Sequence, residues 1–296
     1  MRIAVVHDTL RPTYTSKQLL RAIKELGGTP VYIPLSFLSV EVSSEEPFKI
    51  RGKVLSLDGV LVRSIGFTLD VDQFVFRAAI LLHMEETGIY VMNPILSLLR
   101  SRNKYLSLVS LKRAGILVPF TLVTEDIWYA YEVIKKLGDV VIKPIQGSRG
   151  YGAMRFKDAD LAYEVMRTLI SFRKPIYVQQ FIEKPGRDIR AFVVGERVIA
   201  AMYRIAPEGS WKTNIAQGGK GVPCKLTPDL EDLAIKAVKA LGLWYGGVDI
   251  VESKDGPMVL EVNGTPDWRG LEAVTGVNPA REIVEYLIRK IKGVEQ

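Results

Sequence analysis

The chain has 296 residues, of which 48% are hydrophobic and 25% are charged, so its composition is that of a globular protein with a sizeable core and not of a disordered chain. Lys and Arg exceed Asp and Glu by 40 to 33, and the resulting net charge of +7 suits anionic ligands such as nucleotides. Dense basic runs and basic–aromatic alternation are absent, so we expect no nucleic-acid partner.

The sequence also bears on the compartment. A single cysteine, Cys224, excludes an internal disulfide and a cysteine-rich metal site, and fits a reducing environment. The apolar run at the start, MRIAVVHDTL, is broken by His7 and Asp8, and is too short for a secretory signal. Long uncharged apolar segments are also absent, so we expect a cytoplasmic protein with no membrane partner.

Strands and helices alternate through residues 1–92. Apolar runs predict strands at 2–6, 31–33, 59–62 and 90–92, and helical periodicity predicts helices at 16–26 and 72–86. Such a βαβ pattern indicates a small parallel sheet, and we take residues 1–92 as one α/β domain. No G-x-G-x-x-G follows the first strand, which argues against a dinucleotide site of the Rossmann type.

Residues 93–182 have a different pattern. Asn93-Pro94 and Ser101 each predict the start of a helix, the second of which carries Lys104. Further on, strands are predicted at 120–123, 140–143, 153–156 and 176–181, with helices at 125–137 and 161–170. We expect an antiparallel α+β subdomain with these bounds.

Residues 183–296 form the third predicted part. Strands are expected at 188–194 and 198–204, and a helix opens at Thr227-Pro228. Two apolar strands at 247–251 and 258–262, joined by a short turn, predict a hairpin. A last helix is expected after Asn278-Pro279.

A glycine-rich loop, KPIQGSRGYG, follows the strand that ends at Lys143. Glycines 147, 150 and 152 allow positive φ and leave backbone amides bare, so the loop could fold over phosphates while Lys143 supplies a point charge. No G-K-[ST] precedes a helix here, so the Walker pattern is excluded. A plain glycine hairpin explains the loop equally well.

Three oxygen-bearing side chains lie on the predicted hairpin. Period-2 alternation puts Glu261 and Asn263 on one face of their strand, and the hairpin brings Asp249 beside Glu261. Two carboxylates and an amide oxygen make a hard-ligand set that suits Mg²⁺. A single acid would more simply bond a loop amide or an arginine, but three such groups together favour a metal.

Basic groups come from other segments. Arg190 and Arg204 lie in otherwise apolar strands, so each needs a carboxylate or phosphate partner, in a ligand site or in a core ion pair. Lys212 lies in a polar loop. The stretch YVQQFI, residues 177–182, could bracket a purine ring, although a plain strand also explains it. The chain has no Ser–His or Cys–His arrangement, so covalent catalysis by the protein is not expected.

In chain order these features resemble the ATP-grasp ligases, from about residue 93 to the end. Within that superfamily the chain is most similar to the RimK-type α-L-glutamate ligases, through the stretches DIRAFVVGERVIAAMYRIAPEG, TNIAQGG, GVDIV, LEVNGTP and GLEAVTG. Residues 1–92 are similar to the family's Rossmann-like preATP-grasp domain, with looser motifs. The resemblance implies an ATP-grasp fold of α/β and α+β parts.

The resemblance also implies roles for residues. Lys104 and Lys143 would hold ATP phosphates, Asp188 would approach the nucleotide or acceptor side of the cleft, and Arg190 would belong to the cofactor-binding residues. Asp249, Glu261 and Asn263 would hold two Mg²⁺, which Mn²⁺ can replace. Arg204 and Asn214 would bind the acyl phosphate or the γ-phosphate, and Lys212 would join them as a catalytic residue near the acceptor pocket. The closing loop and the adenine site would be formed by Gln146, Gly147, Ser148, Gly150 and Gly152, and by Gln180, Phe181 and Ile182.

The implied activity is ATP-dependent addition of L-glutamate to a carboxylate acceptor through an acyl phosphate, by a dimer or tetramer. Lys212 stands where the ribosome-modifying members have arginine, and TPDWRG replaces their shorter SPG. Because Trp268 beside Arg269 could stack on a flat ring, we expect a pterin-type coenzyme as acceptor. The alternatives are a ribosomal protein C-terminus, a carrier protein of lysine or arginine biosynthesis, and a nucleotide-binding regulatory protein without turnover.

Overall fold

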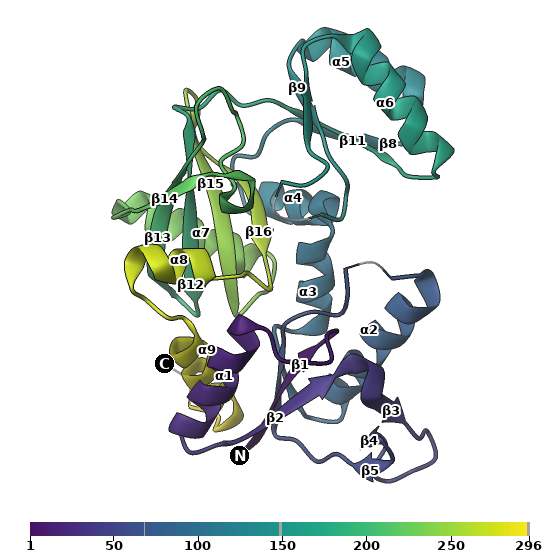
Figure 1. The fold of residues 1–296 in the computed structure, drawn as a ribbon, viewed down its shortest axis with the longest axis vertical. Coiled ribbons are helices and arrows are strands. Elements are labelled where there is room, and N and C mark those ends of the chain that lie inside the picture. The colour runs from purple at the N-terminus through teal and green to yellow at the C-terminus, as the bar shows by residue number, and fades with distance from the viewer. Residues whose placement is uncertain (68, 148–149, 295–296) are drawn as a thin grey trace.

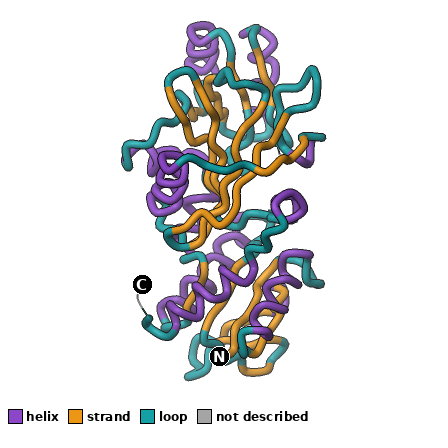
Figure 2. Tube along the Cα trace, turned by 90° about the vertical axis from the view of Figure 1, so that its left-hand side faces the viewer, coloured by secondary structure: helices purple, strands orange, loops and turns teal. Residues whose placement is uncertain are grey.

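The computed structural model describes residues 1–67, 69–147 and 150–294. In these residues the strands form four sheets. Figure 1 shows the three larger sheets along the long axis of the molecule, with the chain's first sheet at the bottom and its middle part at the top. Figure 2 shows from the side that both termini lie at the same end.

The first sheet is parallel, as predicted, with the strand order β2-β1-β6-β7. Its first helix begins at Tyr14 and not near Ser16, because Thr13 caps it and accepts a hydrogen bond from the Ser16 N–H. A small meander of short strands was not predicted, since runs of two or three residues carry no clear period. The elements are β1 (Arg2–His7), α1 (Tyr14–Glu25), β2 (Thr29–Pro34), η1 (Leu35–Phe37), β3 (Leu38–Val40), β4 (Phe48–Ile50), β5 (Lys53–Val54), β6 (Gly59–Val62), α2 (Val71–Glu86) and β7 (Tyr90–Met92).

Two short helices, α3 (Ile95–Arg102) and α4 (Lys104–Arg113), connect this sheet to the rest of the chain. The predicted cap at Ser101 is wrong. Asn103 caps α4, and its Oδ1 accepts hydrogen bonds from the N–H groups of Tyr105 and Leu106, at 3.1 and 3.2 Å. The predicted cap at Asn93 is wrong as well. Its side chain is buried and donates to the carbonyls of Tyr245 and Gly264, at 2.9 and 2.7 Å.

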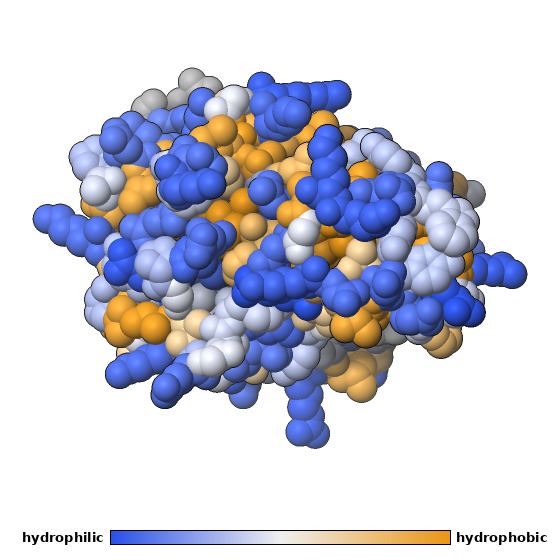
Figure 3. Space-filling model, turned by 90° about the horizontal axis from the view of Figure 1, so that it is seen from above, coloured by the Kyte–Doolittle hydropathy of each residue, from blue (hydrophilic) through white to orange (hydrophobic). Residues whose placement is uncertain are grey.

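The middle part is an antiparallel sheet of order β10-β9-β11-β8, as predicted. Helices α5 and α6 pack on it through a core of Ile134, Met166 and Val178, among others. Seen from above in Figure 3, apolar residues gather near the middle of the face and hydrophilic side chains project around them. The elements are β8 (Thr121–Thr124), α5 (Ile127–Leu137), β9 (Val140–Ile142), β10 (Met154–Phe156), α6 (Ala159–Ser171) and β11 (Ile176–Gln180).

The third part is an antiparallel sheet of order β14-β13-β12-β15-β16, with α7 packed on one face. Its register brings polar residues of neighbouring strands opposite each other: Asp188 faces Arg204, Arg190 faces Asp249, and Asp249 faces Glu261. The edge strand β14 and the helices η2 and α8 were not predicted. The elements are β12 (Arg187–Val194), β13 (Arg197–Ile205), η2 (Ile215–Gln217), β14 (Lys220–Pro223), α7 (Pro228–Ala240), β15 (Tyr245–Ser253), β16 (Gly256–Asn263), α8 (Arg269–Thr275) and α9 (Ala280–Ile291).

The last helix, α9, returns to the beginning of the chain. Ile283 and Leu287 share a core with Leu19 and Ile23 of α1, and Figure 1 shows the two helices beside each other. Burying the apolar face of α9 in this way fixes the C-terminal end against the N-terminal part. Within the described part of the chain, no helix combines the length and the apolar character that a membrane crossing requires.

Candidate functional site

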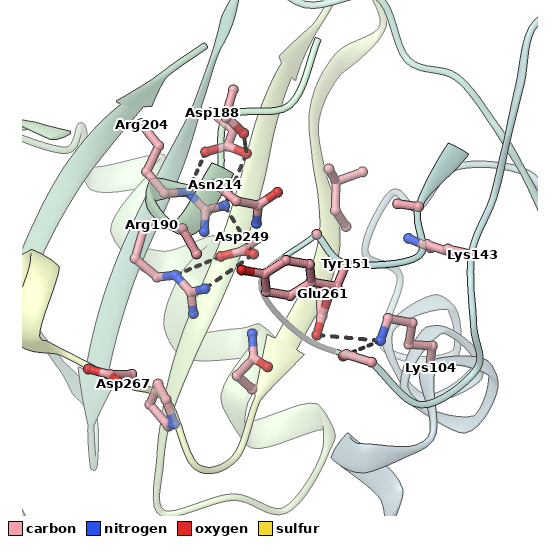
Figure 4. Close-up of a pocket in the computed structure, with 18 of the residues that line it drawn as sticks. Lys104, Lys143, Tyr151, Asp188, Arg190, Arg204, Asn214, Asp249, Glu261 and Asp267 are labelled. Atoms are coloured by element: carbon pink, nitrogen blue, oxygen red, sulfur yellow. Dashed lines mark hydrogen bonds and ion pairs between the residues drawn. The ribbon is translucent and has the colours of Figure 1, made fainter. Parts of the chain in front are cut away.

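A cavity of about 710 Å³ lies where the three parts of the chain meet, and Figure 4 shows the side chains that point into it. Gly152 does not line it, and Ser148 lies outside the described residues. The other predicted site residues all line it, namely Lys104, Lys143, Gln146, Gly147, Gly150, Gln180, Phe181, Ile182, Asp188, Arg190, Arg204, Lys212, Asn214, Asp249, Glu261 and Asn263.

Asp249 lies between two arginines on the strands beside it. Arg190 Nε is 2.8 Å from Asp249 Oδ1, and Arg204 Nη2 is 3.0 Å from Oδ2. Burial raises the pKa of Asp249, and the two guanidinium groups oppose that shift. The predicted alternatives for Arg190 and Arg204, a ligand or a core ion pair, are therefore not exclusive: each arginine pairs with an acid at the cavity wall.

A second ion pair holds Arg204 in place. Asp188 accepts from Arg204 Nε and Nη2 at 2.7 and 3.0 Å and also accepts from the Thr213 hydroxyl, while Lys184 Nζ is 3.5 Å away. Burial alone would raise the pKa of Asp188, but Arg204 and Lys184 bring it below its usual value. Asp188 is only 3% exposed, so much of its hydrogen-bonding capacity is used to orient Arg204.

Two lysines enter the cavity from other elements, as Figure 4 shows. Lys104, in the first turn of α4, donates to the Gly147 carbonyl at 2.7 Å and lies 3.9 Å from Glu261 Oε1. Lys143, just after β9, donates to Gln179 Oε1 at 2.8 Å. Burial lowers the pKa of Lys143 to about 8, against an opposing effect of Glu261. The two ammonium groups thus face the proposed metal ligands.

The glycine-rich loop lies against the segment that carries Lys212 and Asn214. Lys212 Nζ donates to the Gly150 carbonyl at 3.3 Å. Gly150 has φ of +73°, and a Cβ there would lie 2.4 Å from Asn214 Oδ1. Only glycine fits both requirements. The loop therefore forms one wall of the cavity and does not stand free as a plain hairpin.

One end of the cavity is lined by Phe181. Arg155 Cζ lies 3.5 Å from the centre of its ring, and the ring of Trp211 meets it edge to face at 6.0 Å. The N–H groups of Gln180 and Phe181 donate to the carbonyls of Phe120 and Asp139. These contacts hold the Phe181 ring in place, and this end therefore offers a flat aromatic wall, which fits a planar ring.

Trp211, Thr213 and Lys184 also line the cavity, although no motif marked them as site residues. Trp211 and Thr213 flank Lys212 in the polar loop, so their position next to a predicted site residue could have identified them. Lys184 lies in the irregular loop before β12, where no periodicity relates it to Asp188, and only the fold shows that its Nζ is near the carboxylate.

The other end of the cavity is lined by residues 63–67, by Arg102, and by residues 264–271 except Trp268. The interpretation that Trp268 stacks on a ligand is wrong. Its side chain is 0% exposed and packs edge to face on Phe192, within a core that also contains Tyr245 and Leu271. Asp267 and Arg269, on either side of it, do line the cavity.

Asp249, Glu261 and Asn263 fit a hard cation in their donor chemistry. They lie on neighbouring strands, and Asp249 and Glu261 are direct cross-strand partners. Within the described residues, no cluster of three or more His, Cys, Asp or Glu offers an alternative metal site. Since Mg²⁺ commonly uses one or two carboxylates together with phosphate oxygens, so sparse a protein set is adequate.

The family model of the RimK-like ATP-grasp domain matches residues 101–287. The chain belongs to this RimK-like ATP-grasp family. The ATP-grasp chain is 36% identical to a tetrahydromethanopterin:α-L-glutamate ligase of Methanosarcina acetivorans, over 93% of its own length and 95% of the relative. It is 42% identical to a protein of the same description from Methanocaldococcus jannaschii, over 80% and 81% of the two chains.

A comparison with solved structures gives the same family of folds. A solved RimK domain ATP-grasp protein from Sphaerobacter thermophilus superposes with a TM-score of 0.75 at 24% identity, covering 97% of this ATP-grasp chain and 99% of that one. The predicted family and fold are thereby confirmed. Because both curated relatives are ligases of this family, the prediction of an enzyme that forms C–N bonds is confirmed as well.

Proposed function

We propose that this chain is an ATP- and Mg²⁺-dependent ligase that joins L-glutamate to a carboxylate group of a pterin-type coenzyme. One observation carries the proposal: in a single cavity the Asp249–Glu261 pair faces Lys104 and Lys143 on one side and Arg190 on the other. Carboxylates that can hold a metal ion, placed beside cations that can bind phosphate groups, suit a nucleoside triphosphate. The names of the two methanogen relatives support glutamate and the pterin-type acceptor.

In this proposal the adenine occupies the end near Phe181, with contacts from Gln180 and Ile182. The phosphates extend toward Lys104 and Lys143, under the part of the glycine-rich loop that carries Gln146, Gly147 and Gly150. The aromatic wall of Phe181 and Trp211 and the hydrogen bond from Lys104 to the Gly147 carbonyl support this orientation. The acceptor then enters from the opposite end, lined by residues 63–67 and 264–271.

The proposed reaction has two steps. An acceptor carboxylate oxygen attacks the γ-phosphorus of ATP, ADP leaves, and the acyl phosphate is then attacked by the amine of L-glutamate, which releases phosphate and a proton. Arg204, Asn214 and Lys212, held together by the contacts to Asp188 and Gly150, would bind the phosphoryl oxygens. Bound Mg²⁺ would neutralise charge that develops on those oxygens. Asp188 would keep Arg204 aimed at them.

Further parts of the proposal come from the family resemblance. We propose two Mg²⁺ ions on Asp249, Glu261 and Asn263, replaceable by Mn²⁺, a dimeric or tetrameric assembly in the cytoplasm, and domains at 1–92, 93–182 and 183–296. The ion pairs that hold Asp249 support a preorganised metal site.

The test is ADP release together with the product mass. Purified protein with ATP, Mg²⁺ and L-glutamate is incubated with tetrahydromethanopterin, a ribosomal C-terminal peptide or a carrier-protein peptide. We expect ADP release and addition of a glutamyl residue only with tetrahydromethanopterin. Turnover with a peptide instead would overturn the acceptor and keep the ligase. No ADP release with any acceptor would leave the alternative of a regulatory nucleotide-binding protein.

The depressed pKa of Lys143 predicts a pH dependence of nucleotide binding. Below pH 8 the ammonium group is charged, and above it the charge is lost because burial has lowered the pKa to about 8. The KM for ATP should therefore rise as the pH passes from 7 to 9. In Lys143→Arg the rise should disappear, because a guanidinium stays charged throughout. An equal rise in both proteins would contradict the role of Lys143.

A further inference from the structure

Arg63, directly after β6 of the N-terminal part, contacts the segment that follows the proposed metal ligands. It is only 6% exposed, and its Nη2 donates to the Pro266 carbonyl at 2.7 Å. The same guanidinium donates from Nη1 to the Tyr245 hydroxyl at 3.1 Å and from Nη2 to the Thr15 hydroxyl at 3.4 Å. The side chain therefore connects the first sheet to the segment of residues 264–269.

Trp268 completes this contact. The guanidinium of Arg63 lies over its ring, 4.6 Å from Cζ to the ring centre, and the ring also meets Phe192 edge to face. The indole Nε1 is buried and has no hydrogen-bond partner among the described residues. A tryptophan whose N–H is unused is held for the size and the face of its ring, which is the strongest aromatic partner for a cation.

The segment is held at its beginning as well. The Asn93 amide donates to the Gly264 carbonyl at 2.7 Å. A Cβ on Gly264 would lie 2.6 Å from Ser101 Oγ. The backbone at this position therefore lies so close to α3 that only glycine fits there. Between these two anchors the chain passes from Asn263, at the proposed metal site, to Asp267 and Arg269, which line the acceptor end of the cavity.

We propose that Arg63 and Trp268 form a clasp that positions residues 264–269, and that through this segment they set the affinity for the acceptor. The substrate half of this inference rests on the proposed function, whereas the positioning half does not. Arg63 is also a cavity-lining residue, but its Nη groups donate to Tyr245, Thr15 and Pro266, so its direct contacts are with the segment and the core and its effect on the acceptor is exerted through them. Trp268 acts through it because no part of the ring reaches the cavity.

The clasp also explains how the stretch TPDWRG presents polar groups to the cavity. Two cavity-lining residues, Asp267 and Arg269, flank a residue that points into the core. Arg269 is itself steadied, with its Cζ 4.8 Å from the ring centre of Tyr14, and its N–H donates to Asp267 Oδ1 at 2.9 Å. Trp268 thus anchors the two polar residues that the acceptor would meet.

The test compares Arg63→Lys, Trp268→Phe and Trp268→Leu. Lysine at position 63 keeps the charge, but its ammonium group cannot donate several hydrogen bonds and at the same time stack on the indole ring as a planar guanidinium does. Leucine at position 268 removes the ring. Phenylalanine keeps an aromatic face but is smaller, so it should show a weaker effect than leucine. Arg51→Met is the control, because it removes a cation–π contact to Phe37 in the same N-terminal part, away from the cavity.

Two measurements are made on each folded variant. Hydrogen–deuterium exchange without ligand should become faster in residues 264–272 of Arg63→Lys and Trp268→Leu, with β16 unchanged. The KM for tetrahydromethanopterin should rise about tenfold in the same two variants with little change in the KM for ATP, since a misplacement of about 1 Å can cost up to about a hundredfold. Arg51→Met should show neither effect.

The outcomes separate the two proposals. Unchanged exchange at 264–272 in both Arg63→Lys and Trp268→Leu overturns the clasp, whatever the activity. Faster exchange with an unchanged KM for tetrahydromethanopterin overturns its link to the acceptor. If the wild type does not turn over tetrahydromethanopterin, the proposed function fails, and the exchange measurement still decides on the clasp.

Discussion

Glu261→Gln is expected to lower kcat by about a hundredfold or more, the effect of losing one preorganised electrostatic group at a reacting phosphoryl centre. Glutamine keeps the shape of the side chain, so the fold should be retained while the charge opposite Asp249 is lost. The Mg²⁺ concentration needed for half-maximal rate should increase in parallel. Steady-state ADP release across a Mg²⁺ titration measures both quantities.

The matched control for Glu261 is Glu252→Gln. Glu252 lies on the adjacent strand β15 but pairs with Arg187 at 2.9 Å and does not line the cavity. This variant should keep the wild-type kcat and the wild-type Mg²⁺ dependence. If Glu261→Gln behaved in the same way as the control, Glu261 would not be a metal ligand.

Arg204→Met is expected to lower the free energy of unfolding by about 3–5 kcal/mol, because removing one member of a buried charge cluster leaves the others unpaired. Arg204 contacts the carboxylates of both Asp188 and Asp249, and all three side chains are buried. Those acids also keep the pKa of Arg204 above its usual value against the effect of burial. Urea unfolding, followed by far-UV circular dichroism, measures the loss.

Arg197→Met provides the comparison on the same strand. Arg197 pairs with Glu282 at 2.7 Å, but its side chain is 64% exposed. Solvent screens this pair, so we expect a loss of less than about 1 kcal/mol. A similar small loss for Arg204→Met would mean that the buried cluster is not required for folding, and that its acids find other partners.

Most of the architecture could be predicted from hydrophobic patterns. The parallel first sheet, the antiparallel middle sheet and the β15–β16 hairpin each come from apolar runs with clear periods and turn residues between them. The short strands β3, β4 and β5 and the edge strand β14 could not be predicted, because so few residues show no period. Their pairing is decided by neighbouring strands.

Residues of the candidate site could be predicted where a charged side chain lies in an otherwise apolar strand. An acid or arginine in an apolar strand is costly unless it has a partner, and this drew attention to Arg190, Arg204, Asp249 and Glu261, all of which line the cavity. Arg63 ends the apolar strand β6 in the same way and was overlooked. Trp211 and Lys184 gave weaker signals, since aromatic and basic residues in loops are common.

The order of most elements and the set of polar residues that must find partners follow from the sequence, because strand alternation and the cost of burying charge act locally. The ordered motifs indicate the family. The identity of the partners and the direction in which Trp268 points depend on the fold, because both are set by residues far away along the chain. Along the chain Trp268 looks like a ligand contact between Asp267 and Arg269. Burial against Phe192 and Arg63, residues far away in sequence, turned it into the core and left its two neighbours at the cavity.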